Sequence, residues 1–324
     1  MAEPGLSMAE IEQMSARDAF GEALALVGAE DERVILLGAD AIGSTRAAPF
    51  AKKFPGRTFN FGIAEQEMVS AAAGFALRGK IPIATAYGFL LSMRACEQVR
   101  TDICYPNLNV KLMATHTGLS MAAAGSTHHS TEDVAIMRSF PNMTVVAPAD
   151  ALETVKAVKA VISHLGPVYL RMGRGSLSSV YQQDFDFVLG KSVELAEGKD
   201  LTIIAYGIMV AEALNAASTL KTRGLSARVL NMHTIKPLDT EAVLKAATET
   251  GAMVTAEEHT IIGGLGEAVC AATAGACPVP VLRVGLQDCF SAFGPEEDVR
   301  ERMRLTAAEI VRVAEQAYAM KRKK

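Results

Sequence analysis

The chain has 324 residues, of which 50% are hydrophobic and 21% are charged, and its formal net charge is −4. This length suits about two domains with large cores, and the charge balance lacks the basic surface that nucleic acids require. No apolar run reaches the roughly 18 residues of a membrane span. The five cysteines form no CxxC pair and the N-terminal residues do not resemble a signal peptide, which favours reduced thiols and a cytoplasmic location.

The first half of the chain alternates short apolar runs with helical stretches. Runs typical of buried parallel strands begin at Val34, Ile81, Asn109, Met143 and Pro167. An alanine-rich helix is expected over residues 65–79, and a second over 149–166, where Asp150 and Glu153 have the spacing of a capping box. This order predicts right-handed crossovers and a mostly parallel sheet with helices on both faces.

The alternation stops at residues 176–191, a polar stretch that we interpret as a linker. A second series of strands and helices follows, and the last thirty or so residues are strongly helical. The sequence therefore predicts an α/β protein of two doubly wound domains, residues 1–185 and 186–324, each a mostly parallel sheet flanked by helices.

Ligands of doubly wound sheets bind outside the carboxyl ends of the strands. Five segments of the chain satisfy this condition and carry polar or aromatic side chains. They are residues 38–45, 59–68, 85–100, 114–133 and 169–175.

Several of these segments resemble a known family. FNFGIAEQEM (59–68), RACEQVR (94–100) and THTGLSMAAAGSTHHSTED (115–133) are similar, in order and spacing, to the pyrimidine-binding domain of transketolases. YLRMGRG (169–175), AEEHTIIGGLGEAV (256–269) and the terminal helices resemble the downstream segments and the C-terminal domain of that family. The resemblance covers nearly the whole chain.

One family pattern is missing from the sequence. We find no GDG segment with a downstream Asn, with which this superfamily holds Mg²⁺ (or Ca²⁺) and the diphosphate of thiamine diphosphate. The chain therefore resembles the C-terminal subunit of a split transketolase. The resemblance implies a separate N-terminal-half subunit that holds the metal and the diphosphate, in an assembly of two copies of each chain.

The resemblance assigns Glu65 to the cofactor. Thiamine diphosphate reacts through a carbanion on its thiazolium ring, and the protein supplies orientation and electrostatics. A carboxyl group hydrogen-bonded to the far ring nitrogen of the aminopyrimidine makes the exocyclic nitrogen basic. Glu65 matches the position of that carboxyl group in the family, with Ile63 as a neighbouring contact. On the residues alone, Glu65 is simply a glutamate in the first turn of a helix, which the helix dipole favours.

Other cofactor contacts follow from the same resemblance. The aminopyrimidine needs a flat apolar wall, for which Tyr87 is the best match and Phe89 competes if the register slips. Both are alternatively core aromatics. Asp40 matches an aspartate near the thiazolium ring, or it is a turn-capping residue at a strand end.

The resemblance also implies a sugar phosphate site. The family's phosphate cluster corresponds to Arg17, Ser44, His116 and Arg171, which carry the cations and hydroxyl that a dianion requires. His128 corresponds to the histidine that contacts sugar hydroxyls and the reacting centre. Arg17 is alternatively a solvated helix residue.

The loop around Ala124 departs from the family. Usual transketolases read GEDGPTHQ where this chain reads AAAGSTHH, so the aspartate that contacts a sugar hydroxyl is replaced by Ala124. Loss of that carboxylate weakens selection for the hydroxyl, and we expect a substrate other than the standard pentose phosphates. A beta subunit of a 2-oxo-acid dehydrogenase, a deoxyxylulose-phosphate synthase and a non-catalytic relative are the competing interpretations.

Overall fold

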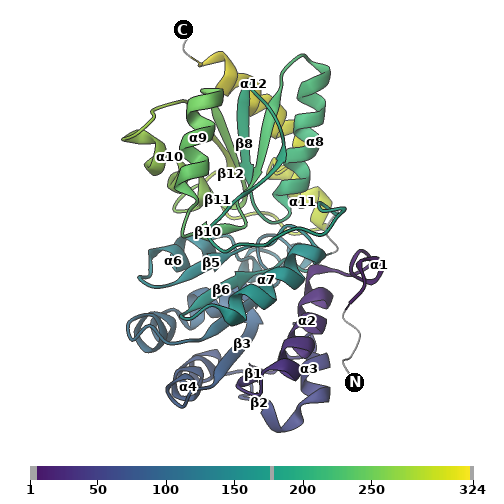
Figure 1. The fold of residues 1–324 in the computed structure, drawn as a ribbon, viewed down its shortest axis with the longest axis vertical. Coiled ribbons are helices and arrows are strands. Elements are labelled where there is room, and N and C mark those ends of the chain that lie inside the picture. The colour runs from purple at the N-terminus through teal and green to yellow at the C-terminus, as the bar shows by residue number, and fades with distance from the viewer. Residues whose placement is uncertain (1–5, 176–178, 322–324) are drawn as a thin grey trace.

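The computed structural model describes residues 6–175 and 179–321, which form two helix-flanked sheets stacked end to end (Figure 1). The N-terminal residues 1–5, residues 176–178 of the predicted linker and residues 322–324 lie outside the described part. The larger sheet runs, in spatial order, β10 (Thr234–Lys236), β5 (Thr144–Val146), β6 (Val168–Arg171), β4 (Lys111–Thr115), β3 (Ile81–Tyr87), β1 (Val34–Gly38) and β2 (Thr58–Asn60). The smaller sheet runs β12 (Val281–Leu286), β11 (Met253–Thr260), β8 (Leu201–Ala205), β9 (Ala227–Asn231) and β7 (Val193–Ala196).

Helices cover both sheets (Figure 1). The first half contributes α1 (Met8–Ile11), α2 (Ala16–Glu30), α3 (Ala48–Lys53), α4 (Glu65–Leu77), α5 (Cys96–Gln98), α6 (Asp133–Ser139) and α7 (Ala151–Ser163). The second half contributes α8 (Met209–Thr222), α9 (Thr240–Thr250), α10 (Leu265–Ala274), α11 (Glu296–Arg302) and α12 (Ala307–Ala319). Short π-helical segments, η2 (Leu90–Arg94) and η3 (Val99–Cys104), flank α5, and 3₁₀ turns occur at η1 (Pro55–Arg57), η4 (Ala122–Ala124) and η5 (Ser126–His128).

The predicted fold class is confirmed. Strands β1, β3, β4, β5 and β6 lie within the predicted apolar runs and pair in parallel. Helix α7 begins after Asp150, whose carboxylate accepts from the Glu153 backbone nitrogen at 2.8 Å. The predicted capping box is only half right, because Glu153 Oε2 accepts from the nitrogen of Ala149, one residue before the cap, at 2.6 Å.

One strand of the larger sheet was not predicted. β10 comes from the second half of the chain, yet it pairs antiparallel with β5, with Thr234 opposite Val146. A stretch of the proposed second domain therefore completes the sheet of the first. The division into residues 1–185 and 186–324 stays a prediction, although no helix or strand lies in the described residues between β6 and β7.

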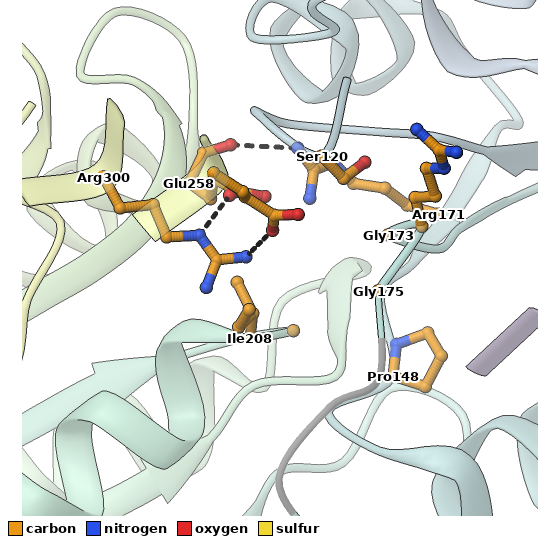
Figure 2. A pocket seen from close by; sticks show the side chains of 11 residues that line it. Ser120, Pro148, Arg171, Gly173, Gly175, Ile208, Glu258 and Arg300 are labelled. Atoms are coloured by element: carbon orange, nitrogen blue, oxygen red, sulfur yellow. Dashed lines mark hydrogen bonds and ion pairs between the residues drawn. The ribbon is translucent and has the colours of Figure 1, made fainter. Parts of the chain in front are cut away.

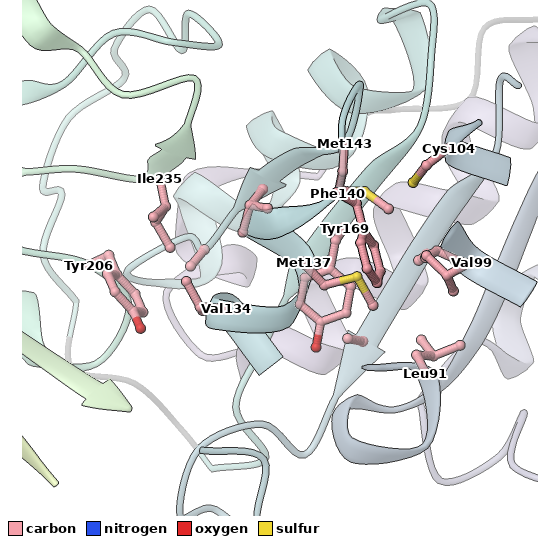
Figure 3. Packing of buried hydrophobic residues seen from close by; sticks show 14 of the residues in the cluster. Leu91, Val99, Cys104, Val134, Met137, Phe140, Met143, Tyr169, Tyr206 and Ile235 are labelled. Carbon is pink, nitrogen blue, oxygen red and sulfur yellow. The ribbon is translucent and has the colours of Figure 1, made fainter. Parts of the chain in front are cut away.

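The two halves share a continuous apolar core at their junction. Figure 3 shows Tyr206 and Ile235, from the second half, near Val134 and Met137 of α6, and all four are buried in one cluster. His259 Nε2 accepts from the Ala135 nitrogen at 3.2 Å, so the second half also caps the start of α6. Apolar burial and capping together bind the halves into one unit.

The glycine-rich turn at 263–266 opens helix α10. Glu257 Oε2 accepts from the Leu265 nitrogen at 2.8 Å, and Oε1 from the Gly266 nitrogen at 2.9 Å. A Cβ on Gly264 would lie 2.0 Å from Glu257 Oε2, so only glycine fits there. The helix N-terminus therefore holds the protein's own buried carboxylate, as expected from its dipole.

Candidate active site

Glu65 is the first residue of α4, and its side chain is 2% exposed. The preceding residue, Ala64, makes no side-chain cap. Glu65 Oε2 accepts from Arg94 Nη1, at the end of η2, at 2.9 Å. Arg94 lies in the RACEQVR segment but was not predicted as a partner, because the contact joins residues 29 positions apart.

Exposed apolar side chains lie next to Glu65 and its partner Arg94 in the sequence. Ile63, two residues before Glu65, is 78% exposed, and Met93, one residue before Arg94, is also exposed. Exposed large apolar side chains are typical of a surface that another molecule covers. We call Ile63, Glu65 and Met93 the Glu65 rim.

Both candidate stacking aromatics lie at the carboxyl end of β3. The Tyr87 ring centroid is 4.3 Å from that of His116, and its hydroxyl donates to Ser44 Oγ at 3.2 Å. The Phe89 ring lies 6.3 Å from Tyr87 and makes an edge contact of 5.3 Å with His128. The structure therefore places Tyr87 on the predicted phosphate side and Phe89 on the His128 side, and the choice between them as stacking residue stays open.

Arg17, Ser44 and His116 come together as predicted from the sequence. Arg17 Nη1 donates to the Ser44 carbonyl at 2.8 Å and lies 3.1 Å from His116 Nε2. Burial, with Arg17 and Arg174 nearby, lowers the pKa of His116 to about 3. His116 is therefore neutral near pH 7, and Nε2 accepts from Arg17 while Nδ1 donates to Thr115 Oγ1 at 2.9 Å. Its φ of 56° is a strained conformation for a non-glycine residue.

A pocket of about 490 Å³ opens beside this cluster. Arg17, Arg46 and Arg174 line it together with the carboxylates of Asp18 and Glu296. Burial, followed by repulsion from Arg46 and Arg174, lowers the pKa of Arg17. We call the pocket lined by these three arginines the anion pocket; His116 does not line it and contacts it through Arg17.

Both carboxylates that line the pocket are paired with arginines, and Asp18 neutralises Arg46, one of the three arginines that line it. Asp18 pairs with Arg46 at 3.2 Å, and Glu296 pairs with Arg300 of the same helix. Arg17, in contrast, donates to the carbonyls of Ser44 and Arg174. Positive charge therefore exceeds its local compensation, which favours an anionic ligand.

Arg171 has a different environment from the one expected of a phosphate ligand. Its Nε donates to Asp133 Oδ2 at 3.0 Å, and its Nη2 donates to the carbonyls of Glu258 at 2.9 Å and Ser130 at 3.3 Å. Figure 2 shows it reaching towards Glu258 beside a small cavity of about 20 Å³. The bond to the Glu258 carbonyl joins the two halves of the chain, and the predicted phosphate contact remains a prediction.

Arg174, like Arg46, lines the pocket but was not predicted from the sequence. It belongs to the same YLRMGRG segment, but β6 ends at Arg171, so Arg174 lies beyond the strand end. The rule that ligands bind outside the carboxyl ends of strands would have selected it over Arg171.

The remaining candidates lie in turns. His128 is half-buried in a 3₁₀ turn, with its Nδ1 3.0 Å from Thr127 Oγ1. Asp40 is exposed directly after β1, with φ 54°, and its backbone nitrogen donates to Asn60 Oδ1 at 2.8 Å. Ala124 is exposed at the end of η4. The roles assigned to His128 and Asp40 stay predictions.

Two further properties of the described residues bear on the site. No group of three or more His, Cys, Asp or Glu side chains within 6–175 and 179–321 is arranged to hold a metal ion. In the same part of the chain, every helix is too short or too polar to cross a bilayer.

Comparison with known proteins identifies the class. Residues 12–179 match the transketolase pyrimidine-binding domain, and residues 190–310 match the transketolase C-terminal domain. The chain belongs to the transketolase family.

Within that family the chain resembles the separate C-terminal subunits of split enzymes. It is 42% identical to a 6-deoxy-6-sulfo-D-fructose transketolase subunit of a Clostridium species, over 96% of this chain and 97% of that one. It is 40% identical to one subunit of an apulose-4-phosphate transketolase from Phocaeicola vulgatus, over 88% of this chain and 92% of that one. A solved structure described as a split-gene transketolase, inactive beta4 tetramer, is 44% identical and superposes with a TM-score of 0.88, covering 95% of this chain and 99% of that one. The predicted resemblance is confirmed.

Proposed function

We propose that this chain is the C-terminal subunit of a thiamine diphosphate-dependent transketolase, which transfers a two-carbon ketol unit from a ketose to an aldose. The observation that carries the proposal is Glu65, a buried carboxylate at the start of α4 within an exposed apolar rim. A carboxylate in this setting suits a flat heterocycle that is apolar on its faces and basic at its edge.

The side chains of this chain fit the aminopyrimidine half of the cofactor. When bound, thiamine diphosphate supplies the carbanion chemistry of ketol transfer. Glu65 would bond to the pyrimidine ring nitrogen and share a proton there, while Tyr87 or Phe89 would give the ring a flat wall and Ile63 would cover it. Asp40, exposed at the end of β1, would face the thiazolium side.

The diphosphate and its Mg²⁺ (or Ca²⁺) would be held by an N-terminal-half subunit. The missing GDG pattern supports this division, as does the exposed Glu65 rim. The beta4 tetramer of the similar split-gene protein is described as inactive, which fits a subunit that cannot work alone. We propose two copies of each chain, acting in the cytoplasm.

The anion pocket supports a substrate with a terminal anion. Arg17 and Arg174 would bind that group, and His116 would accept a hydrogen bond from Arg17 and so orient it. The names of two relatives specify a sulfonated ketose and a ketose phosphate. With Ala124 in place of the family's aspartate, we propose a modified or deoxy ketose rather than the standard pentose phosphates.

His128 would contact the sugar near the reacting carbons. It lies beside Phe89, and a half-buried imidazole is suited to hold a hydroxyl or move a proton. Its ring would therefore stand between the cofactor's wall and the anion pocket.

Co-purification with the product of an adjacent N-terminal-half gene, followed by a screen of ketose donors, tests the proposal. With thiamine diphosphate and Mg²⁺ we expect ketol transfer by the pair and none by either chain. A complex that forms but transfers no ketol unit from any ketose or ketose phosphate would overturn it, as would full turnover with Glu65→Ala.

A further inference from the structure

We propose that the second half of the chain sets the position of His128 through a clamp formed by Ser291 on His129 and Ser126. Ser291 lies in the loop between β12 and α11, and the His128 loop lies between β4 and α6. This role makes Ser291 a positioning residue for ketol transfer, so the inference rests on the proposed function.

Ser291 contacts the His128 turn on both sides. Its Oγ lies 2.7 Å from His129 Nδ1, and its carbonyl accepts from Ser126 Oγ at 2.5 Å. The contacts therefore fall two residues before His128 and one residue after it. Such a bracket fixes the direction of the intervening side chain without touching it.

Two further backbone bonds hold the His128 loop, one from the loop of Ser291 and one from the end of β11. The Gly294 nitrogen donates to the Ala122 carbonyl at 3.1 Å. At the other end, the Thr260 nitrogen donates to the Thr131 carbonyl at 2.8 Å. The second half thus holds the His128 loop from Ala122 to Thr131.

His128 itself has few restraints. Its Nδ1 lies near the adjacent Thr127 hydroxyl, and its ring makes an edge contact with Phe89. A half-buried imidazole with contacts this sparse depends on its backbone for its direction. The bracket at Ser126 and His129 supplies that backbone restraint.

His129 is suited to a structural hydrogen bond between the two loops and not to a role in the reaction. The residue is 4% exposed, and its Nε2 is fully buried. Burial lowers its pKa, so the ring is neutral near pH 7. Ser291 Oγ also lies 3.2 Å from the Ala292 carbonyl and can donate there, in which case it accepts from His129 Nδ1.

The loop that carries Ser291 also approaches the His128 loop at Gly125, and it contains an exposed residue, Cys289, that can serve as a control. Gly125 has φ 78°, and a Cβ added to it would lie 3.4 Å from the Phe293 Cβ, so the two loops touch closely here. Cys289 is exposed in the same loop as Ser291. Cys289 therefore offers a matched control that changes the loop without changing the clamp.

The test compares Ser291→Ala, Ser291→Thr and Cys289→Ser in the assembled two-chain enzyme. Alanine keeps the backbone carbonyl and its contact with Ser126, and it removes the hydroxyl with its bonds to His129 and to the Ala292 carbonyl. Loss of the His129 bond is worth a factor of roughly 3 to 10 in turnover at saturating substrate. We expect that loss for alanine, with the KM for thiamine diphosphate unchanged. Threonine should restore turnover to within about twofold, and serine at 289 should leave it unchanged.

A double-mutant cycle separates positioning from a general structural effect. In a His128→Ala background, Ser291→Ala should cause no further loss, because the side chain that it positions is absent. An equal loss in both backgrounds would overturn the proposal. So would full activity of Ser291→Ala in the wild-type background.

A second readout does not need turnover. In the chain without its partner, amide hydrogen exchange of residues 122–129 should accelerate about 3- to 10-fold in Ser291→Ala and stay constant in Cys289→Ser. Unchanged exchange in Ser291→Ala would overturn the clamp itself. Inactivity of the wild-type pair, with the exchange result as expected, would instead refute the proposed function and leave the clamp as a structural contact.

Discussion

The Glu65 rim and the anion pocket lie on the same half of the chain but differ in how complete they are. Around Glu65, the apolar side chains of Ile63 and Met93 are exposed. In the anion pocket, Arg17 is held by the carbonyls of Ser44 and Arg174 and by His116. The anion pocket is therefore held in place by contacts within this chain. The Glu65 rim, in contrast, has apolar side chains that nothing in the described part of the chain covers.

This difference bears on which parts of the proposed active site each of two subunits would supply. A preformed pocket binds its ligand without ordering loops, so the anion pocket can orient a substrate by itself. A buried carboxylate with an open apolar rim needs a second surface to exclude water from it. We therefore infer that substrate recognition belongs mostly to this chain, and that the cofactor is shared.

The largest effect on turnover should come from a substitution in the Glu65 rim. In the proposed function, Glu65→Gln removes the carboxylate that would share a proton with the cofactor, and loss of such a group costs about 10²- to 10⁴-fold in turnover. Glu67→Gln, an exposed change two residues further on in α4, is the matched control and should be neutral. Steady-state kinetics of the pair measure both. Equal losses of turnover in the two variants would contradict a cofactor contact at Glu65, because any negative charge in the first turn of α4 would then have the same effect.

The next effect concerns Arg171, whose predicted phosphate role competes with its bonds to Asp133. Arg171→Ala leaves Asp133 buried without its cation, which typically costs about 3–5 kcal/mol of unfolding free energy. Arg33→Ala, which breaks an exposed pair with Asp31, should leave the free energy of unfolding almost unchanged. Urea unfolding measures both. An Arg171→Ala variant that keeps its stability but has a raised KM would instead support the predicted phosphate contact of Arg171.

Arg174 should have a smaller effect that is confined to the substrate. Hydrogen bonds to charged groups are worth about 1.5–3 kcal/mol, so Arg174→Ala should raise the KM for an anionic ketose roughly 10- to 100-fold. Turnover of a neutral ketose should stay the same. Arg223→Ala removes an equal charge from an exposed pair with Glu315 and serves as the control. A uniform loss on charged and neutral substrates would contradict a pocket that recognises charge.

The smallest effect is the pH dependence that His116 contributes. Its pKa is lowered to about 3 in the fold by burial and by Arg17 and Arg174, whereas an unfolded histidine titrates near about 6.5. Between these values the unfolded chain binds more protons, so stability falls as the pH drops below about 6.5. From pH 7 to 5 we expect His116 to contribute about 2 kcal/mol of that loss, and His116→Gln to reduce the slope accordingly. An unchanged slope would show that His116 is not held neutral.

The sequence predicted those parts of the molecule that depend on local patterns. Apolar runs located β1, β3, β4, β5 and β6 of the larger sheet, and Asp150 marked the start of α7, because side-chain periodicity and capping act over a few residues. The resemblance to transketolases grouped Arg17, Ser44 and His116 from sequence alone. Their grouping is geometric, and their roles remain to be tested.

What the sequence missed depends on distant contacts. The pairing of β10 with β5, the Arg94 bond to Glu65 and the contact of Ser291 with His129 each join segments far apart in the chain. The choice between Arg171 and Arg174 depended on where β6 ends, and strand boundaries are the least certain feature of a sequence pattern. Single-sequence patterns carry no signal for the three distant contacts.

Titration of thiamine diphosphate, with Mg²⁺ present, tests most directly whether the cofactor is shared between chains. The titration would be followed calorimetrically for this chain, for the N-terminal-half subunit and for their equimolar mixture. We expect the mixture to bind far more tightly than either chain, and Glu65→Gln to weaken only the mixture. Equally tight binding by this chain alone would contradict a divided cofactor site.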